Sequence, residues 1–176
     1  MDHAVADLPI LSQSEGSAND FERRVNLVFQ LLGFDVTPMG QGTGRNPDAI
    51  AKAPQEHYAL IIDAKARIEP YVMGTEDRKF IEYIRQQQPP LLREGYRKIY
   101  FVIVSSGFSG RDIASIMRVK QETQIPVVEI SAVQILRILA FAIENPRHYD
   151  RRKFEQLLIL EGELADSAIN KILKTQ

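Results

Sequence analysis

The chain has 176 residues, no cysteine, three histidines and a formal net charge of −1. This composition excludes disulfides and thiolate metal sites, and it leaves little material for a histidine-based zinc site or a Ser-His-Asp triad. A nearly neutral chain does not bind nucleic acid by bulk charge, so an enzyme of this composition is expected to use carboxylates and a metal. We find no run of membrane-spanning length and no secretory signal, which predicts a cytoplasmic protein without a membrane partner.

Residues 1–17 show no hydrophobic period and contain Ser, Gly and Ala, which predicts a flexible tail or linker. Residues 18–176 are expected to form a single domain that begins with a helix. Ser17, followed by Asp20, is a candidate cap for this helix. Its apolar positions have helical spacing: Phe21, Val25, Val28 and Leu32. Glu22 lies at the margin of this stripe, where an acid is more often solvated than functional.

A short strand over residues 34–39 is predicted to lead into the glycine-rich residues 40–46. This stretch lacks the lysine and hydroxyl residue of a phosphate-binding P-loop, and no helical pattern follows it. We interpret it as a loop that lets a phosphate backbone approach closely.

The most informative stretch runs from Pro47 to Lys65. Residues 58–62 form a short apolar run typical of a buried strand, and residues 46–52 can form its partner. Side chains alternate along a strand, so Asp63 and Lys65 share one face. A turn centred on Gln55–Glu56 places Asp48 opposite Asp63, at about 5 Å between Cβ atoms.

Two carboxylates this close are destabilising unless positive charge lies between them. Lys65 and a divalent cation such as Mg²⁺, which binds one or two carboxylates, would both supply it. Strand-end acids and lysines are more often solvated groups that protect a sheet edge. The preceding Pro47–Asp48 in a plausible partner strand makes the pattern more specific than Asp-x-Lys alone.

The remaining pattern alternates helices and strands. A helix over residues 74–88, with Phe80, Ile81 and Ile84 inward, is predicted to end at Pro89–Pro90. Residues 98–105 form the strongest, central strand, and a following helix should bury Ile113, Ile116 and Met117. A strand at 125–130, a helix opened by the Ser131–Gln134 capping box, and helices near 151–160 and 163–174 complete the chain. The fold class is therefore α/β, a mixed central sheet with helices on both faces.

An acid-bearing helix, then Pro47–Asp48, then Asp63-Ala64-Lys65 on an apolar strand resembles the PD-(D/E)XK nuclease superfamily. The resemblance is closest to the cleavage domain of type IIS, FokI-type restriction endonucleases, and covers roughly residues 20–160. It also rests on four further segments: Gly42–Asp48, Ile61–Ala66, Tyr83 and Ser106–Gly110.

The resemblance implies hydrolysis of phosphodiester bonds in double-stranded DNA with Mg²⁺, or with Mn²⁺. It implies that Asp48 and Asp63 bind the metal together with the Ala64 backbone carbonyl. Lys65 would orient or activate the water, and Glu22 would complete the metal shell through water. The residues placed to contact the substrate are Arg45, Asn46 and Arg67.

Three positions depart from the family pattern. Asn46 stands where a basic residue is expected, Ala49 where glycine is typical, and Ala64 where a small hydroxyl residue is typical. The first departure would weaken substrate contact, but none removes a catalytic group.

The family pairs two cleavage domains through the helix that follows the lysine. Arg78 and Glu82 occupy positions of that interface, although an ion pair within one helix is an equally simple interpretation. The expected partners are therefore a transient homodimer or a DNA-recognition domain or subunit.

Two alternatives stay open. One is a structure-specific or RNA-directed nuclease in repair or defence. The other is a non-catalytic α/β interaction subunit whose acids and lysine are solvated.

Overall fold

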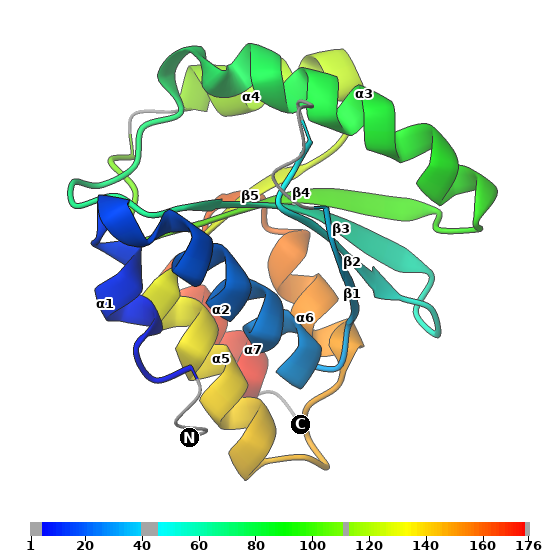
Figure 1. Cartoon of the computed structure of the whole chain (residues 1–176). Helices are drawn as coiled ribbons and strands as arrows, with labels where there is room; N and C mark the ends of the chain where they lie inside the picture. Colours follow the sequence, from blue (N-terminus) through cyan, green and yellow to red (C-terminus); the bar gives the residue numbers. More distant parts are fainter. Residues whose placement is uncertain (1–4, 40–45, 111–112, 175–176) are drawn as a thin grey trace.

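The computed structural model describes residues 5–39, 46–110 and 113–174. A six-stranded sheet has the order β1-β2-β3-β4-β5-β6. Helices α3 and α4 cover one face, and α1, α2, α5, α6 and α7 cover the other (Figure 1). This arrangement confirms the predicted α/β class.

The strands are β1 Asp35–Pro38, β2 Ala49–Ala53, β3 Tyr58–Lys65, β4 Lys98–Ser105, β5 Val127–Ser131 and β6 Gly162–Glu163. The first three pair antiparallel, and β3 to β6 pair parallel. Ala49 pairs with Ile62, which is the register that the turn at Gln55–Glu56 predicts. The two-residue strand β6 lies inside the region for which the sequence predicts only helix.

The helices are α1 Leu8–Ser12, α2 Ala18–Leu31, α3 Asp77–Arg93, α4 Ile113–Thr123, α5 Ala132–Glu144, α6 Arg151–Leu158 and α7 Asp166–Lys174, with 3-10 turns at Glu15–Ser17 and Gly74–Glu76. The capping box of Ser131 and Gln134 at the start of α5 is confirmed. Within the described residues, no helix combines the length and the apolar character needed to cross a membrane.

Each face of the sheet has its own apolar core, as expected for a sheet covered on both sides. In the core beneath α2, α5 and α6, three phenylalanines pack edge-to-face on one another: ring centroids lie 5.7 Å apart for Phe29–Phe34, 5.4 Å for Phe34–Phe154 and 5.9 Å for Phe29–Phe154. Tyr58 extends this cluster at 5.8 Å from Phe34. These contacts fix α2 and α6 against the strand that carries Asp63 and Lys65.

The segment 5–17 differs from the flexible tail that the sequence predicts. Val5 and Leu8 are fully buried in the core, and α1 contacts α2 and α5. Asp7 also forms an ion pair with Arg24 of α2, with 3.2 Å between Oδ1 and Nε. The segment is too short to show a helical period, so the sequence gives no signal of its burial. Ser17 occupies the N-cap position of α2, but its hydroxyl pairs with that of Ser14 instead of capping the helix.

Helix α3 continues through Pro89 and Pro90, so the predicted end at these prolines is wrong. Each proline lacks the N–H that would donate to the preceding turn, which weakens the helix locally. The last turn is held by tertiary contact, because Leu91 is buried in the core of this face. It is closed by the N–H groups of Glu94 and Tyr96, which donate to Pro90 and Leu91 carbonyls at 3.0 and 3.1 Å.

Helix α4 presents a different face to the sheet from the predicted one. Ile113 and Met117 are 67% and 53% exposed, so their predicted inward position is wrong. Ile116 packs against the core as expected, and Val119 and Thr123 are the buried residues of this helix. Apolar spacing over one short helix does not determine which side of the helix packs against the sheet.

Candidate active site

The β2–β3 hairpin brings Asp48 next to the end of β3. Asp48 directly precedes β2, and its backbone N–H donates to the Ile62 carbonyl at 2.9 Å. Its Oδ2 accepts a hydrogen bond from the Ala64 N–H at 2.6 Å. Ala49 pairs with Ile62, so Asp48, the residue before Ala49, lies near Asp63, whose charge contributes to the raised pKa of Asp48.

Asp63 and Lys65 lie on the sheet face covered by α3. The Lys65 ammonium is 2.7 Å from Asp63 Oδ2 and 5.5 Å from the centroid of the Phe80 ring. Asp63 is almost completely buried. Ala64 belongs to the core on the opposite face of the sheet, so its side chain faces away from Asp63 and Lys65. The strand thus holds one buried acid and one lysine side by side.

The two carboxylates are costly to ionise together. Burial, followed by repulsion from Asp63, raises the pKa of Asp48 to about 7, although the Ala64 N–H acts against the shift. Burial also raises the pKa of Asp63 despite the charge and hydrogen bond of Lys65. Burial acts to lower the pKa of Lys65, but the Asp63 charge and hydrogen bond outweigh it and raise that pKa. Lys65 is therefore a cation at neutral pH.

The donor set fits a hard divalent cation. Asp48 and Asp63 offer carboxylate oxygens, and such cations bind one or two carboxylates and otherwise keep water ligands. Within residues 5–39, 46–110 and 113–174, no group of three or more His, Cys, Asp or Glu side chains could hold a metal. Asp48 and Asp63, with the Ala64 backbone carbonyl, are candidate ligands for such an ion.

We expect Asp48→Asn to stabilise the metal-free protein at pH 8. The pKa of Asp48 rises from 3.8 to about 7 on folding, so ionising it costs folding free energy as pH rises through this window. Removing the charge should recover about 4 kcal/mol above pH 7, because the pKa rises by about 3 units at roughly 1.4 kcal/mol each, and nothing near pH 4. Unfolding midpoints measured in EDTA at pH 4, 5 and 8 test this.

Asp35→Asn is the matched control, because Asp35 is an exposed acid of β1 in the same sheet. Its substitution removes one carboxylate charge from the sheet without touching the acid pair. An Asp48→Asn variant that differs from wild type by the same amount at all three pH values would contradict the prediction.

The other predicted residues have different surroundings. Glu22 is partly buried on α2, and its charge contributes to the raised pKa of Asp48, which places it near the acids. Asn46 is partly buried just before Pro47. Arg67 has an exposed side chain, while its backbone N–H donates to the Ser12 carbonyl at 2.7 Å. Arg45 lies outside the described residues.

Arg78 and Glu82 are both exposed on α3, one helical turn apart. The buried side of the helix carries Phe80, Ile81 and Ile84 instead. Both predicted interface residues are therefore accessible on the layer that covers the acid pair.

Sequence reasoning missed Glu76 and Tyr71. Glu76 Oε1 lies 3.5 Å from the Lys65 ammonium, and Tyr71 donates its hydroxyl to Glu76 Oε2. Both also line a cavity of about 720 Å³ formed by residues 67–76. The only sequence signal was an acid in the first turn of the helix predicted over residues 74–88, which is a common feature of helix N-termini.

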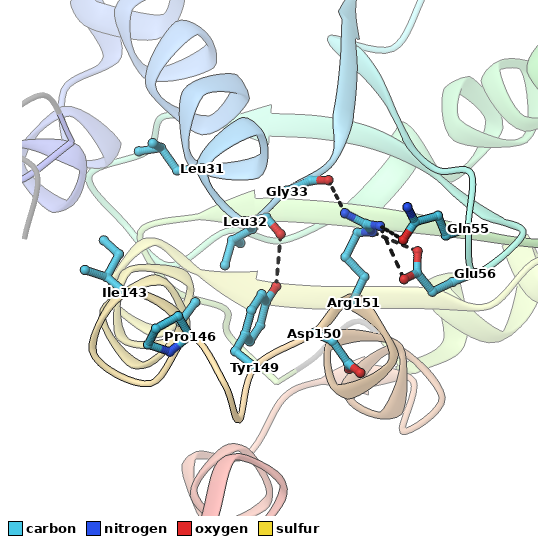
Figure 2. A pocket seen from close by; sticks show the side chains of 11 residues that line it. Leu31, Leu32, Gly33, Gln55, Glu56, Ile143, Pro146, Tyr149, Asp150 and Arg151 are labelled. Carbon is cyan, nitrogen blue, oxygen red and sulfur yellow. Dashed lines mark hydrogen bonds and ion pairs between the residues drawn. The ribbon is translucent and has the colours of Figure 1, made fainter.

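A second cavity of about 470 Å³ lies at the opposite end of β3 (Figure 2). Arg151 lines this cavity. Its guanidinium donates to Glu56 Oε2 at 2.8 Å, to the Gly33 carbonyl at 2.6 Å and to Gln55 Oε1 at 3.2 Å. Tyr149 donates to the Leu32 carbonyl at 3.4 Å. These groups tie α6 to the β2–β3 turn, so they serve the fold.

Comparison with known proteins gives a family and a fold. The family model described as the FokI cleavage domain matches residues 5–165. A solved structure of restriction endonuclease FokI is 21% identical with a TM-score of 0.73, covering 90% of this chain and 30% of that chain. A structure of FokI bound to DNA is 18% identical with a TM-score of 0.76, covering 93% and 31%. The chain thus spans about a third of these proteins. No curated protein sequence matches.

Proposed function

Because this chain belongs to the FokI cleavage-domain family, we propose that it is a divalent-metal-dependent endonuclease that hydrolyses DNA phosphodiester bonds. It would act as the cleavage domain or catalytic subunit of a type IIS-like restriction enzyme. The observation that carries this proposal is the pair of opposed acids, Asp48 and Asp63, with Lys65 at 2.7 Å from Asp63. The match to FokI bound to DNA supports double-stranded DNA as the partner.

The roles follow from the chemistry of the side chains. Asp48, Asp63 and the Ala64 carbonyl would hold Mg²⁺ or Mn²⁺, which supplies Lewis-acid activation of phosphate and lowers the pKa of water. Lys65 offers fixed positive charge where the transition state gains negative charge. Glu22, on the nearby helix α2, would orient water at the acids.

Substrate and partner contacts are proposed for residues around this centre. Asn46 and Arg67 flank the acid-bearing strands, and Arg45 is adjacent in sequence. Arg78 and Glu82 are exposed for a homodimer in which each residue meets the other across a twofold axis. A DNA-recognition domain or subunit would then select the site, and the cytoplasmic location stays a prediction.

A plasmid assay tests the activity. We expect supercoiled DNA to be nicked and linearised with Mg²⁺ or Mn²⁺, and to survive in EDTA. The same ions should raise the unfolding midpoint of the wild type, because binding to the folded state stabilises it, and should not do so for an Asp48→Ala/Asp63→Ala variant. The nicked-to-linear ratio reports whether two sites act together.

Parallel reactions with single-stranded DNA, branched DNA and RNA separate the alternative nuclease classes. Two results together would support the non-catalytic interaction subunit instead. The protein would leave every substrate intact, even when tethered to a DNA-binding module, and neither ion would change its unfolding midpoint.

A further inference from the structure

Lys65 has a second acidic neighbour besides Asp63. Its Nζ lies 3.5 Å from Glu76 Oε1, and Glu76 is held by the 3-10 turn at the start of α3. Glu76 is only partly buried and lies outside the hairpin that carries the two opposed acids. It therefore reaches the lysine from a different element of the fold.

Glu76 itself is fixed by Tyr71. The Tyr71 hydroxyl donates to Glu76 Oε2 at 2.5 Å, and Glu76 Oε1 lies 3.5 Å from the Lys65 ammonium and 4.0 Å from that of Lys79. Tyr71 is 3% exposed, and its position is set by the loop after β4. Its backbone N–H donates to Gly107 at 2.8 Å, its carbonyl accepts from Ser109 at 3.2 Å, and its ring packs edge-to-face on Phe108.

The geometry points to Glu76 and Tyr71 as a positioning pair for Lys65, a role that rests on the proposed nuclease function. The physical reason lies in the different demands on the two carboxylates beside the lysine. A carboxylate that ligates a divalent cation shares its charge, so its ion pair with lysine weakens. Asp63 is such a ligand in the proposed site, whereas Glu76 keeps its charge for the ammonium.

Phe80 is a third neighbour of Lys65. The centroid of its ring lies 5.5 Å from the ammonium, and the ring limits the rotamers of the lysine. Lys65 thus contacts Glu76 of the 3-10 turn before α3 and the Phe80 ring in the first turn of α3. A lysine held in this way would keep its ammonium in place when Asp63 ligates the metal ion.

The test compares Glu76→Gln, Glu76→Ala and Tyr71→Phe with the matched control Glu69→Gln, an exposed acid of the same loop. Loss of an outer partner of a site typically costs about 10- to 100-fold, so Glu76→Ala should lower kcat by this factor with KM unchanged. Glu76→Gln, which retains an acceptor, should lose less, and Tyr71→Phe should add no loss in the Glu76→Ala background.

Two readouts separate positioning from other roles. Mn²⁺ affinity by calorimetry and DNA affinity in Ca²⁺ should stay within about twofold of wild type for Glu76→Gln. A large loss of Mn²⁺ affinity would make Glu76 a metal ligand and overturn the proposal. Unchanged kcat in Glu76→Ala would overturn it as well.

A metal-free experiment keeps the inference separate from the nuclease function. In EDTA, Glu76→Gln should lower the unfolding midpoint in the wild-type background and change it less in the Lys65→Met background, because the lost partner is Lys65. Equal shifts in both backgrounds would refute the contact. A wild type that cleaves no DNA, but shows this coupling, would refute the proposed function and leave the positioning contact standing.

Discussion

Lys65→Ala is expected to lower the DNA cleavage rate by at least about 10²- to 10³-fold, the loss seen when one fixed donor is removed from charge developing in a transition state. Lys65 places its ammonium within 2.7 Å of Asp63, at the end of the strand that carries both groups. Because Lys65 is largely buried, water screens its charge less, so this charge stabilises the transition state more than an exposed lysine would.

The measurement is the single-turnover rate on plasmid or duplex DNA with Mn²⁺. Lys52→Ala is the matched control, because Lys52 lies in the neighbouring strand β2 and pairs with Glu94 rather than with the acids. It should cleave like wild type. Circular dichroism should show that Lys65→Ala is folded. If this variant retains wild-type rates, Lys65 has no catalytic role and the acids act without it.

Phe154→Ala is expected to destabilise the protein by about 3 to 5 kcal/mol, the usual cost of deleting a buried aromatic ring. Phe154 is fully buried and packs edge-to-face on both Phe29 and Phe34. Its removal leaves a void between α6, α2 and the sheet. For a chain of this size the loss corresponds to about 6 to 20 °C in the unfolding midpoint.

Urea and thermal unfolding of the two proteins check this expectation. Ile159→Ala provides the control, because Ile159 follows directly after α6 and is 58% exposed. Its effect should stay within about 0.5 kcal/mol. A Phe154→Ala variant with an unfolding free energy as high as that of the control would show that the aromatic cluster does not support α6.

The sequence predicts those parts of the fold that rest on local patterns. The hairpin register follows from the positions of Asp48 and Asp63 about the Gln55–Glu56 turn, and the capping box of Ser131 follows from its partner Gln134. Both patterns involve residues close together in the sequence, so local backbone geometry determines which of them meet.

Parts that depend on distant packing were not predictable in this way. Helix α3 passes Pro89 and Pro90 because Leu91 is buried against the sheet, and residues 5–17 are ordered because Val5 and Leu8 pack into the core. Glu76 was missed for the same reason. Its approach to Lys65 depends on how the chain returns after β3, which no local pattern encodes.

The position of the acid pair within one hairpin has a consequence for the order of folding. Asp48, Asp63 and Lys65 lie within residues 48–65 and need only a local turn, whereas the parallel pairing of β3 with β4 must close the segment between Lys65 and Lys98. Short loops close at lower entropic cost than long ones, so we expect the hairpin to form before the parallel sheet. Pulse-labelled hydrogen exchange should then protect the Ala64 amide, which donates to Asp48, before the amides of β4 and β5. Simultaneous protection would show that the acids meet only when the whole sheet condenses.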